Sequence, residues 1–318
     1  MTGLSRLALF AFAAIFAVRG GLTLLAQIQR SSSDAFDVIS VKPSPPQPPG
    51  ARGGGPCGGG PAQIEPARFA LCRSTAYLLI SWGYGLPCAR AEAHDLILGG
   101  PGWLKSDQFD IQAVIPAGTP TYTREQFRDG IGPELQLMIR NLLADRFKMV
   151  THQESREKAV YALTVAKNGS KLQPFEPDSC DSTPPQAPLR PIQPGQKRRC
   201  SHILGVLPAT NRGGWKGNVT ADGSTIAGFT DLLSLALDRP IIDRTGMSGL
   251  FDFSLDFSVE GTRLTQFLIP DANQSAAAAG SLPSIFTAVQ DQLGLKLEAT
   301  KGPVDTIVID QIEKPTKN

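Results

Sequence analysis

The chain has 318 residues, of which 41% are hydrophobic and 19% are charged, and its formal net charge at pH 7 is +2. These values are typical of a globular protein with a sizeable core, exclude a disordered or collagenous chain, and at this length favour two domains. The charges are nearly balanced and form no long basic run, so nucleic acid is not expected as a partner.

Residues 1–26 have the pattern of a targeting segment. Arg6 precedes an apolar run over residues 7–18, Arg19 interrupts it, and mostly small or apolar residues follow as far as Ala26. The pattern predicts a secretory signal peptide. The alternative is an uncleaved anchor, because about 20 apolar residues span a bilayer. In both cases we expect the rest of the protein to be extracytoplasmic, either periplasmic or secreted, with an anchor as its only contact with a membrane.

The first half of the fold is expected over residues 34–171. A strand at 36–44 and a loop rich in proline and glycine open it. Two units of helix, strand, turn and strand follow. In the first, a strand at 68–72 leads into a helix at 74–84, strands at 96–98 and 108–115, and the turn 99–103 between them. In the second, a helix begins at Pro133, and a charged turn at 153–158 separates strands at 147–151 and 160–166.

Residues 172–200 are rich in proline and are interpreted as a linker between domains. The second half, 201–316, is expected to hold two more units. A hairpin at 217–226 precedes them. The third unit has a helix at 229–237, strands at 240–243 and 251–257, and a turn that uses Gly246 and Gly249 for positive φ. The fourth has a helix from Ser281 that ends at Gly294 and a hairpin of residues 295–298 and 304–312.

The two halves repeat the same order of elements. A strand, a Ser/Thr helix start and an apolar helix occur at both 68–85 and 218–237, and a helix followed by two strands ends each half. We therefore predict an α+β fold of two similar halves, each a pair of helix-plus-β-hairpin units with helices packed on antiparallel sheet. Four unrelated pieces are the alternative, since identity between the copies is low.

Five cysteines suit an oxidising compartment. Cys57 with Cys72 and Cys180 with Cys200 each bracket a flexible loop, so these two disulfides are predicted, each stabilising the fold by about 3 kcal/mol in the chain-entropy model. Cys88 is then left as a small buried residue or a free thiol.

Catalytic and metal-binding patterns are absent from the sequence. The three histidines are far apart, and there is no HExxH, CxxC, GxSxG or Walker sequence, so no catalytic residue, metal or cofactor is predicted. Carboxylates could converge across the halves of a hydrolase, with the candidates Asp110, Asp145, Asp243 and Asp252, although roles in turns and on wet strand faces explain them as well.

Aromatic side chains beside glycine-rich turns supply the candidates for ligand binding. Trp82, Tyr84 and Trp103 could form a shallow apolar platform, with packing in the core as the alternative. Asp243 and Arg244, where the turn before residue 251 begins, complete the candidate ligand-binding set.

Several phrases are specific in wording and order: FDVISVKPS, GGPGWLKSDQFDIQA, LLADRFKMVTHQESREKAVYALTVAKNGSKLQP, PIIDRTGMSGLFDFSLDF and SIFTAVQDQLGLKLEATKGPVDTIVIDQIEKP. With them the chain resembles, over residues 36–315, the uncharacterised soil-associated family of exported bacterial proteins, built on a domain of unknown function. Similar domains are attached to membrane metallopeptidase sensors, so the resemblance implies extracytoplasmic sensing or binding. Together these features predict a non-catalytic module that binds an extracytoplasmic ligand or protein, with a carboxylate-dependent hydrolase as the alternative.

Overall fold

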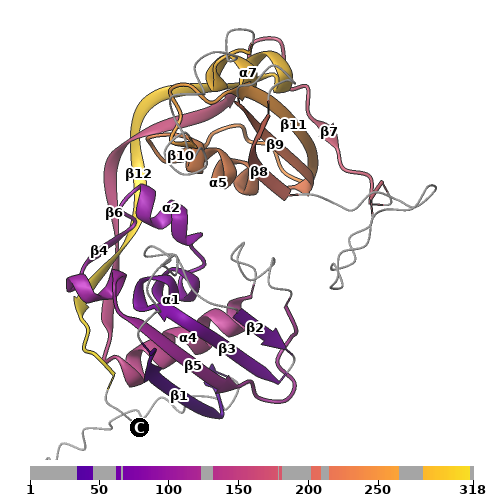
Figure 1. Ribbon diagram of the computed structural model, residues 1–318. Coiled ribbons are helices and arrows are strands. Elements are labelled where there is room, and N and C mark those ends of the chain that lie inside the picture. The colour runs from indigo at the N-terminus through magenta and orange to yellow at the C-terminus, as the bar shows by residue number, and fades with distance from the viewer. Residues whose placement is uncertain are drawn as a thin grey trace, which may run out of the picture.

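A computed structural model describes residues 34–45, 62–65, 67–122, 132–177, 179–180, 202–208, 215–264 and 282–315. The predicted targeting segment, residues 1–26, lies outside these ranges. Within them no helix is long and apolar enough to cross a membrane. The chain has a mixed α+β fold, as predicted, with two lobes that are joined along one side by a ribbon of two long strands (Figure 1).

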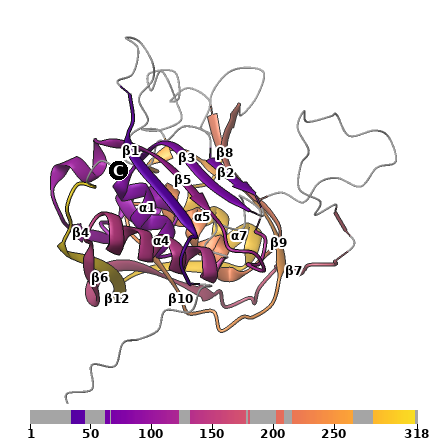
Figure 2. The ribbon, with the colours of Figure 1, turned by 90° about the horizontal axis from the view of Figure 1, so that it is seen from below.

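The first lobe contains a four-stranded antiparallel sheet in the order β1-β5-β3-β2. Its strands are β1 (Val38–Pro43), β2 (Ala62–Glu65), β3 (Arg68–Thr75) and β5 (Gln108–Val114). Its longer helices are α1 (Ala76–Gly83) and α4 (Pro133–Arg146), which lie between this sheet and the ribbon (Figure 2). Two short elements complete the lobe, namely α2 (Cys88–Ala93) and the 3-10 helix η2 (Gly102–Lys105).

The second lobe contains a sheet in the order β7-β11-β9-β8. Its strands are β7 (Gln173–Pro174), β8 (His202–Pro208), β9 (Trp215–Ser224) and β11 (Phe251–Ser258). Its helices are α5 (Ile226–Ala236) and α7 (Ile285–Leu293). The start of the predicted linker, at β7, therefore pairs with the second sheet.

The ribbon consists of β6 (Val150–Val165) and β12 (Leu295–Gln311), which pair antiparallel along nearly their whole lengths. A short parallel strand adds to each end: β4 (Ile97–Gly99) pairs with β12, and β10 (Ile241–Asp243) pairs with β6. The ribbon enters both cores, because Val304 and Ile307 pack in the first hydrophobic cluster whereas Leu163 packs in the second.

Local sequence signals explain where several elements begin and end. The Thr75 hydroxyl accepts the Leu78 N–H and caps α1, and Pro133 occupies the first turn of α4. Gly294 ends α7 at φ +67°, as predicted. The alternation in β11 is also confirmed, since Phe251, Phe253, Leu255 and Phe257 are buried.

The predicted helix-plus-hairpin unit is wrong. Residues 147–166 do not form two strands around a charged turn, because β6 runs unbroken through residues 153–158. Likewise β12 is one strand, and β9 takes the place of the hairpin predicted at 217–226. β4 and β10 do not pair with β5 and β11 but with the ribbon. The even-numbered residues of the charged segment are hydrogen-bonded to β12, so its charges did not require a turn there.

The predicted Cys57–Cys72 disulfide is also wrong, since Cys72 is an exposed free cysteine on β3. Cys88, expected to be left unpaired, is buried and disulfide-bonded, and Cys180 is disulfide-bonded as well. Cys57 and Cys200 lie outside the described residues, so the pairing of Cys180 with Cys200 stays a prediction.

Candidate functional site

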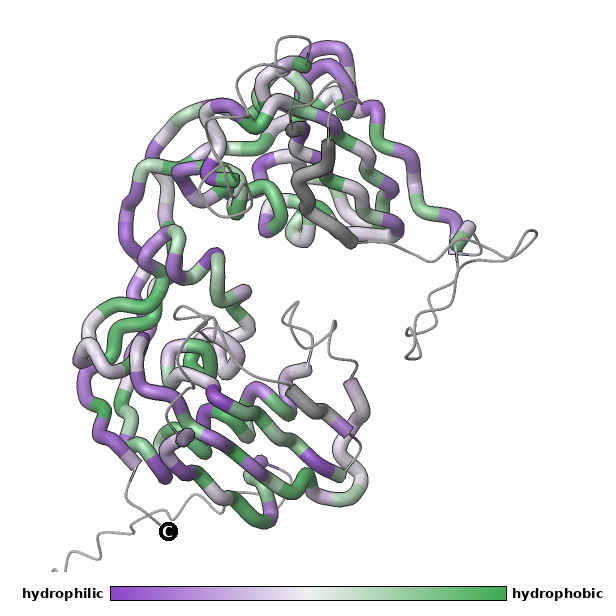
Figure 3. Tube along the Cα trace, in the orientation of Figure 1, coloured by the Kyte–Doolittle hydropathy of each residue, from purple (hydrophilic) through white to green (hydrophobic). Residues whose placement is uncertain are grey.

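The middle of β6 is a long stretch of strand without buried residues. None of the ten residues from Val150 to Ala159 is buried, although they include both faces of the strand. Hydrophilic residues dominate this part of the ribbon (Figure 3). A strand in a folded protein normally buries at least one face, so this stretch contributes little to the cores.

One edge of β6 is open along the same stretch. On the side away from β12, the only strand that pairs with β6 in the described structure is β10, at Tyr161 to Leu163. In Figure 1 the middle of β6 forms the outer margin of the ribbon. The backbone between Val150 and Val160 therefore presents a row of hydrogen-bonding groups to the outside.

The backbone bonds to β10 show which residues supply these groups. The Tyr161 N–H donates outward to the Pro240 carbonyl at 2.9 Å, and the Leu163 carbonyl accepts from the Arg244 N–H at 2.9 Å. Because backbone groups alternate along a strand and the ladder is regular here, the odd-numbered residues 153, 155, 157 and 159 also direct their N–H and C=O groups outward. The even-numbered residues face β12.

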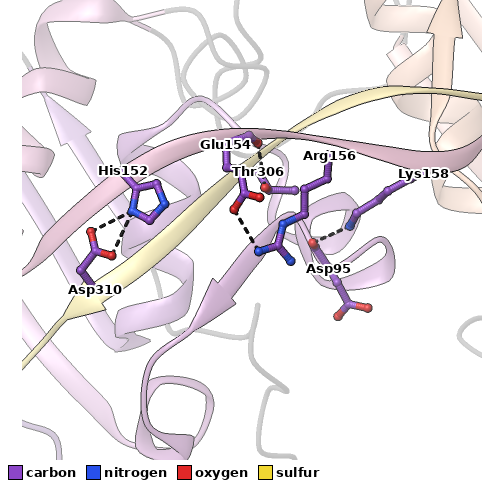
Figure 4. Close-up of polar contacts among 7 residues, drawn as sticks. All are labelled: Asp95, His152, Glu154, Arg156, Lys158, Thr306 and Asp310. Atoms are coloured by element: carbon purple, nitrogen blue, oxygen red, sulfur yellow. Dashed lines mark hydrogen bonds and ion pairs between the residues drawn. The ribbon is translucent and has the colours of Figure 1, made fainter.

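The even-numbered side chains form a charged row on one face of the ribbon (Figure 4). His152 Nδ1 lies 2.9 Å from both Asp310 oxygens, and Arg156 donates to the Glu154 carboxylate at 2.9 Å. This bond lowers the pKa of Glu154, so the pair carries both charges at neutral pH. Exposed pairs of this kind add little stability, which leaves them free to contact another molecule.

The row ends at the joint between the lobes. Lys158 Nζ donates to the Asp95 carbonyl oxygen at 2.9 Å (Figure 4). It also donates to the His94 carbonyl oxygen at 2.9 Å and so caps the end of α2. From α2, Arg90 forms an ion pair with Asp231 of α5. These contacts connect the ribbon, the first lobe and the second lobe.

His94 lies at the centre of this joint and is 6% exposed. Its Nε2 donates to the Ser234 carbonyl of α5 at 2.8 Å, because a carbonyl can only accept. The buried Nδ1 has no hydrogen-bond partner within the described residues. Burial lowers the pKa of His94, the Ser234 bond opposes this effect, and nearby cations lower it further: Arg263, Arg90 and Lys158.

The predicted aromatic platform does not form as one exposed surface. Trp82 and Tyr84 pack partly buried against the first core, where the Tyr84 hydroxyl is hydrogen-bonded to Thr151 and the Arg140 guanidinium lies over the Tyr84 ring. Trp103 stacks on Phe147, with ring centroids 6.4 Å apart. Packing therefore explains these rings, and ligand binding by them remains a prediction.

The other predicted binding residues lie near the top of the ribbon. Asp243 is exposed and accepts both the backbone N–H and the hydroxyl of Thr245 at 2.8 Å, as expected for a residue that begins a turn. Arg244 is exposed, and Gly246 and Gly249 have the positive φ angles that the turn requires.

The four carboxylates proposed for a hydrolase have separate local surroundings. Asp110 accepts the Arg73 N–H at 2.9 Å, Asp252 accepts the Gly223 N–H at 3.0 Å, and Asp145 is exposed near the end of α4. No group of three or more His, Cys, Asp or Glu residues suited to a metal ion occurs among the described residues. The open edge of β6 is thus the best candidate for a functional surface.

Comparison with known families agrees with the coarse part of the predicted resemblance. A family model described as "Protein of unknown function (DUF3738)" matches residues 77–312, which is more than half of the chain. The chain belongs to the DUF3738 family. No curated protein and no solved structure matches it significantly. The description of DUF3738 names no activity, so export and soil association stay predictions.

The DUF3738 match covers the whole ribbon, the strands and helices of the second lobe, and the part of the first lobe from α1 onward, whereas β1, β2 and β3 precede it. Sequence reasoning missed the open edge because it placed a turn at residues 153–158. The signal that could have shown it is the absence of glycine and proline from residues 150–159, which is unusual for a turn.

Proposed function

We propose that this DUF3738 protein is an exported, non-catalytic interaction module that binds an extracytoplasmic protein along the open edge of β6. The observation that carries the proposal is the edge of β6 from Val150 to Ala159, where no residue is buried and no strand of the described structure pairs on the side away from β12. An exposed edge of this kind can accept an additional strand, in which backbone hydrogen bonds provide affinity and side chains provide specificity.

The charges on β6 support selective binding. Edge strands are commonly protected by charged side chains, which prevent indiscriminate pairing. Glu154, Arg156 and Lys158 would repel most strands, and a partner must present a complementary pattern.

A proline substitution tests this function directly. Ser155 directs its N–H outward, so Ser155→Pro removes a donor from the open edge and leaves the ladder with β12 intact. Asp305→Pro is the matched control: Asp305 is paired with Ser155 in the ribbon, and its N–H points to the opposite edge. The native Pro303 lies on that same edge within β12, so the ribbon tolerates proline there.

The measurement is calorimetric titration with extended peptides, cell-wall fragments and glycans. We expect saturable binding of peptides that Ser155→Pro abolishes and Asp305→Pro preserves. Turnover of any of these compounds, with loss of activity in Asp243→Ala, would support the hydrolase alternative. No contact described above favours that alternative.

The extracytoplasmic location rests on residues 1–26. Fractionation of cells that express the full chain should recover the protein outside the cytoplasm. Deletion of residues 1–26 should retain it inside.

We also infer that the two halves arose by duplication. The matching orders β1-β5-β3-β2 and β7-β11-β9-β8 support this inference, as does the reciprocal addition of β4 to β12 and β10 to β6. The repeated unit is then a half-sheet with its helices and one ribbon strand. An experimental structure in which residues 62–165 do not superimpose on 202–311 would contradict it.

A further inference from the structure

We propose that the partner at the open edge of β6 is a second copy of this chain, paired antiparallel about a two-fold axis at Ser155. This inference rests on the proposed function of the same edge and names its occupant. Two copies would join their ribbons into one continuous sheet in the order β4-β12-β6-β6-β12-β4. The contact uses the same patch on both copies, as a two-fold dimer requires.

The backbone permits this register. Ser155 directs its N–H and C=O outward, so two Ser155 residues placed opposite each other exchange two hydrogen bonds. In the same register Gln153 of one copy lies opposite Glu157 of the other. These two positions also point outward, and so do Thr151 and Ala159, which lie opposite each other farther out, so five hydrogen-bonded pairs form with about ten bonds between the copies.

The side chains select this register among its neighbours. With Ser155 at the axis, Glu154 of each copy lies opposite Arg156 of the other. A shift that places Glu154 at the axis sets Glu154 against itself, and a shift that places Arg156 there sets Arg156 against itself. Opposite charges across a strand pair stabilise it and like charges destabilise it. Only the Ser155 register gives two Glu–Arg pairs. In that register no carboxylate lies opposite another carboxylate, and no guanidinium group lies opposite another guanidinium group.

The geometry of antiparallel pairing strengthens these contacts. The even-numbered residues occupy the non-hydrogen-bonded positions of the new pair, where side chains approach most closely. Glu154 and Arg156 already pair at 2.9 Å within one copy, so the dimer would bring together a network of four alternating charges. The remaining opposed pair on this face is His152 with Lys158.

The length of the open edge fits the contact. β10 occupies the edge of β6 from Tyr161 onward, and β6 begins at Val150. The pairing of Thr151 with Ala159 in this register uses nearly all of the free edge. The contact between the copies ends before β10 of one copy would reach the first residue of β6 in the other.

Charge reversal tests the proposal on the purified full-length protein. Sedimentation equilibrium across a wide concentration range should give twice the monomer mass for the unmodified protein. Glu154→Arg places Arg opposite Arg156, and Arg156→Glu places Glu opposite Glu154. We expect each variant alone to raise the dissociation constant by about tenfold or more.

Two combinations distinguish the interface from an effect on folding. A mixture of Glu154→Arg with Arg156→Glu restores both opposed pairs between unlike copies, although the pair within each copy remains broken. The double variant E154R/R156E restores all of them. Both should dimerise like the unmodified protein, and circular dichroism should show every variant folded.

The outcomes separate this inference from the proposed function. An unmodified protein that stays monomeric at every concentration overturns the dimer, and so does a dimer that neither charge reversal weakens. If peptides still bind and Ser155→Pro abolishes their binding, the edge remains an interaction site and only the second copy is wrong. If Ser155→Pro changes neither peptide binding nor the mass measured by sedimentation, both the dimer and the proposed function of the edge are wrong.

Discussion

The Nε2 of His94, at the end of α2, donates to the Ser234 carbonyl of α5 across the joint between the lobes. The bond fixes one tautomer of the neutral ring, and burial together with the nearby cations Arg263, Arg90 and Lys158 lowers the pKa of His94 and so favours that neutral form. Contact between α2 and α5 is therefore sensitive to the protonation state of a single side chain.

This relationship predicts a loss of stability in acid. The pKa of His94 is lowered below its ordinary value of 6.5 in the folded state, so the unfolded chain binds the proton more readily. The contribution is fully present above pH 6.5 and is lost as pH falls through the folded pKa. Thermal melts below pH 6.5 should show a falling melting temperature. His94→Gln should flatten this dependence, and a His94→Gln variant whose melting temperature falls in acid as steeply as that of the unmodified protein would contradict it.

The Arg90–Asp231 ion pair should contribute measurably to the docking of the lobes. Their side chains are 22% and 32% exposed, whereas those of the Lys296–Glu298 pair are both 49% exposed. A double-mutant cycle in urea should give a coupling free energy of about 1 kcal/mol for the first pair and under about 0.5 kcal/mol for the second. Equal coupling free energies for the two pairs would show that the position of Arg90–Asp231 at the joint does not strengthen this ion pair.

Two features of the structure require glycine at position 294. Its φ of +67° is unfavourable for other residues, and a Cβ would lie 2.2 Å from the Gly169 carbonyl oxygen. Gly246 has nearly the same φ, +68°, but no atom within 4 Å of its Cβ position. In denaturant unfolding, Gly246→Ala should cost about 1–2 kcal/mol, and Gly294→Ala should cost clearly more. Similar losses would mean that the loop at Gly169 moves aside freely.

The cysteines can be distinguished chemically. Cys72 is exposed and free, whereas Cys88 and Cys180 are disulfide-bonded. Iodoacetamide added to the native, non-reduced protein should label Cys72 and neither of the others. Peptide mapping of the same sample tests the predicted Cys180–Cys200 bond, and a labelled Cys88 would contradict its disulfide.

The boundaries of several elements could be predicted because their causes are local. Proline at the first turn of α4 and glycine after α7 act through their own backbone geometry. The alternation of Phe251, Phe253 and Leu255 likewise follows from the two faces of one strand. These local signals do not depend on residues that are distant in the sequence.

The candidate site could not be predicted in the same way. Residues 153–158 are polar and charged, a composition that fits both a turn and an exposed strand. Their extended form depends on β12, whose residues 302–307 lie almost 150 positions later.

The sequence by itself determined where several helices begin or end and which residues of β11 are buried, because capping and alternation act over a few residues. Only the tertiary structure decided which strands are neighbours: β4 joins β12, β10 joins β6, and among the described strands none pairs with the outer edge of β6 before Tyr161. Strand pairing is set by how two cores bury their apolar faces together, and that requirement is not encoded in any single segment.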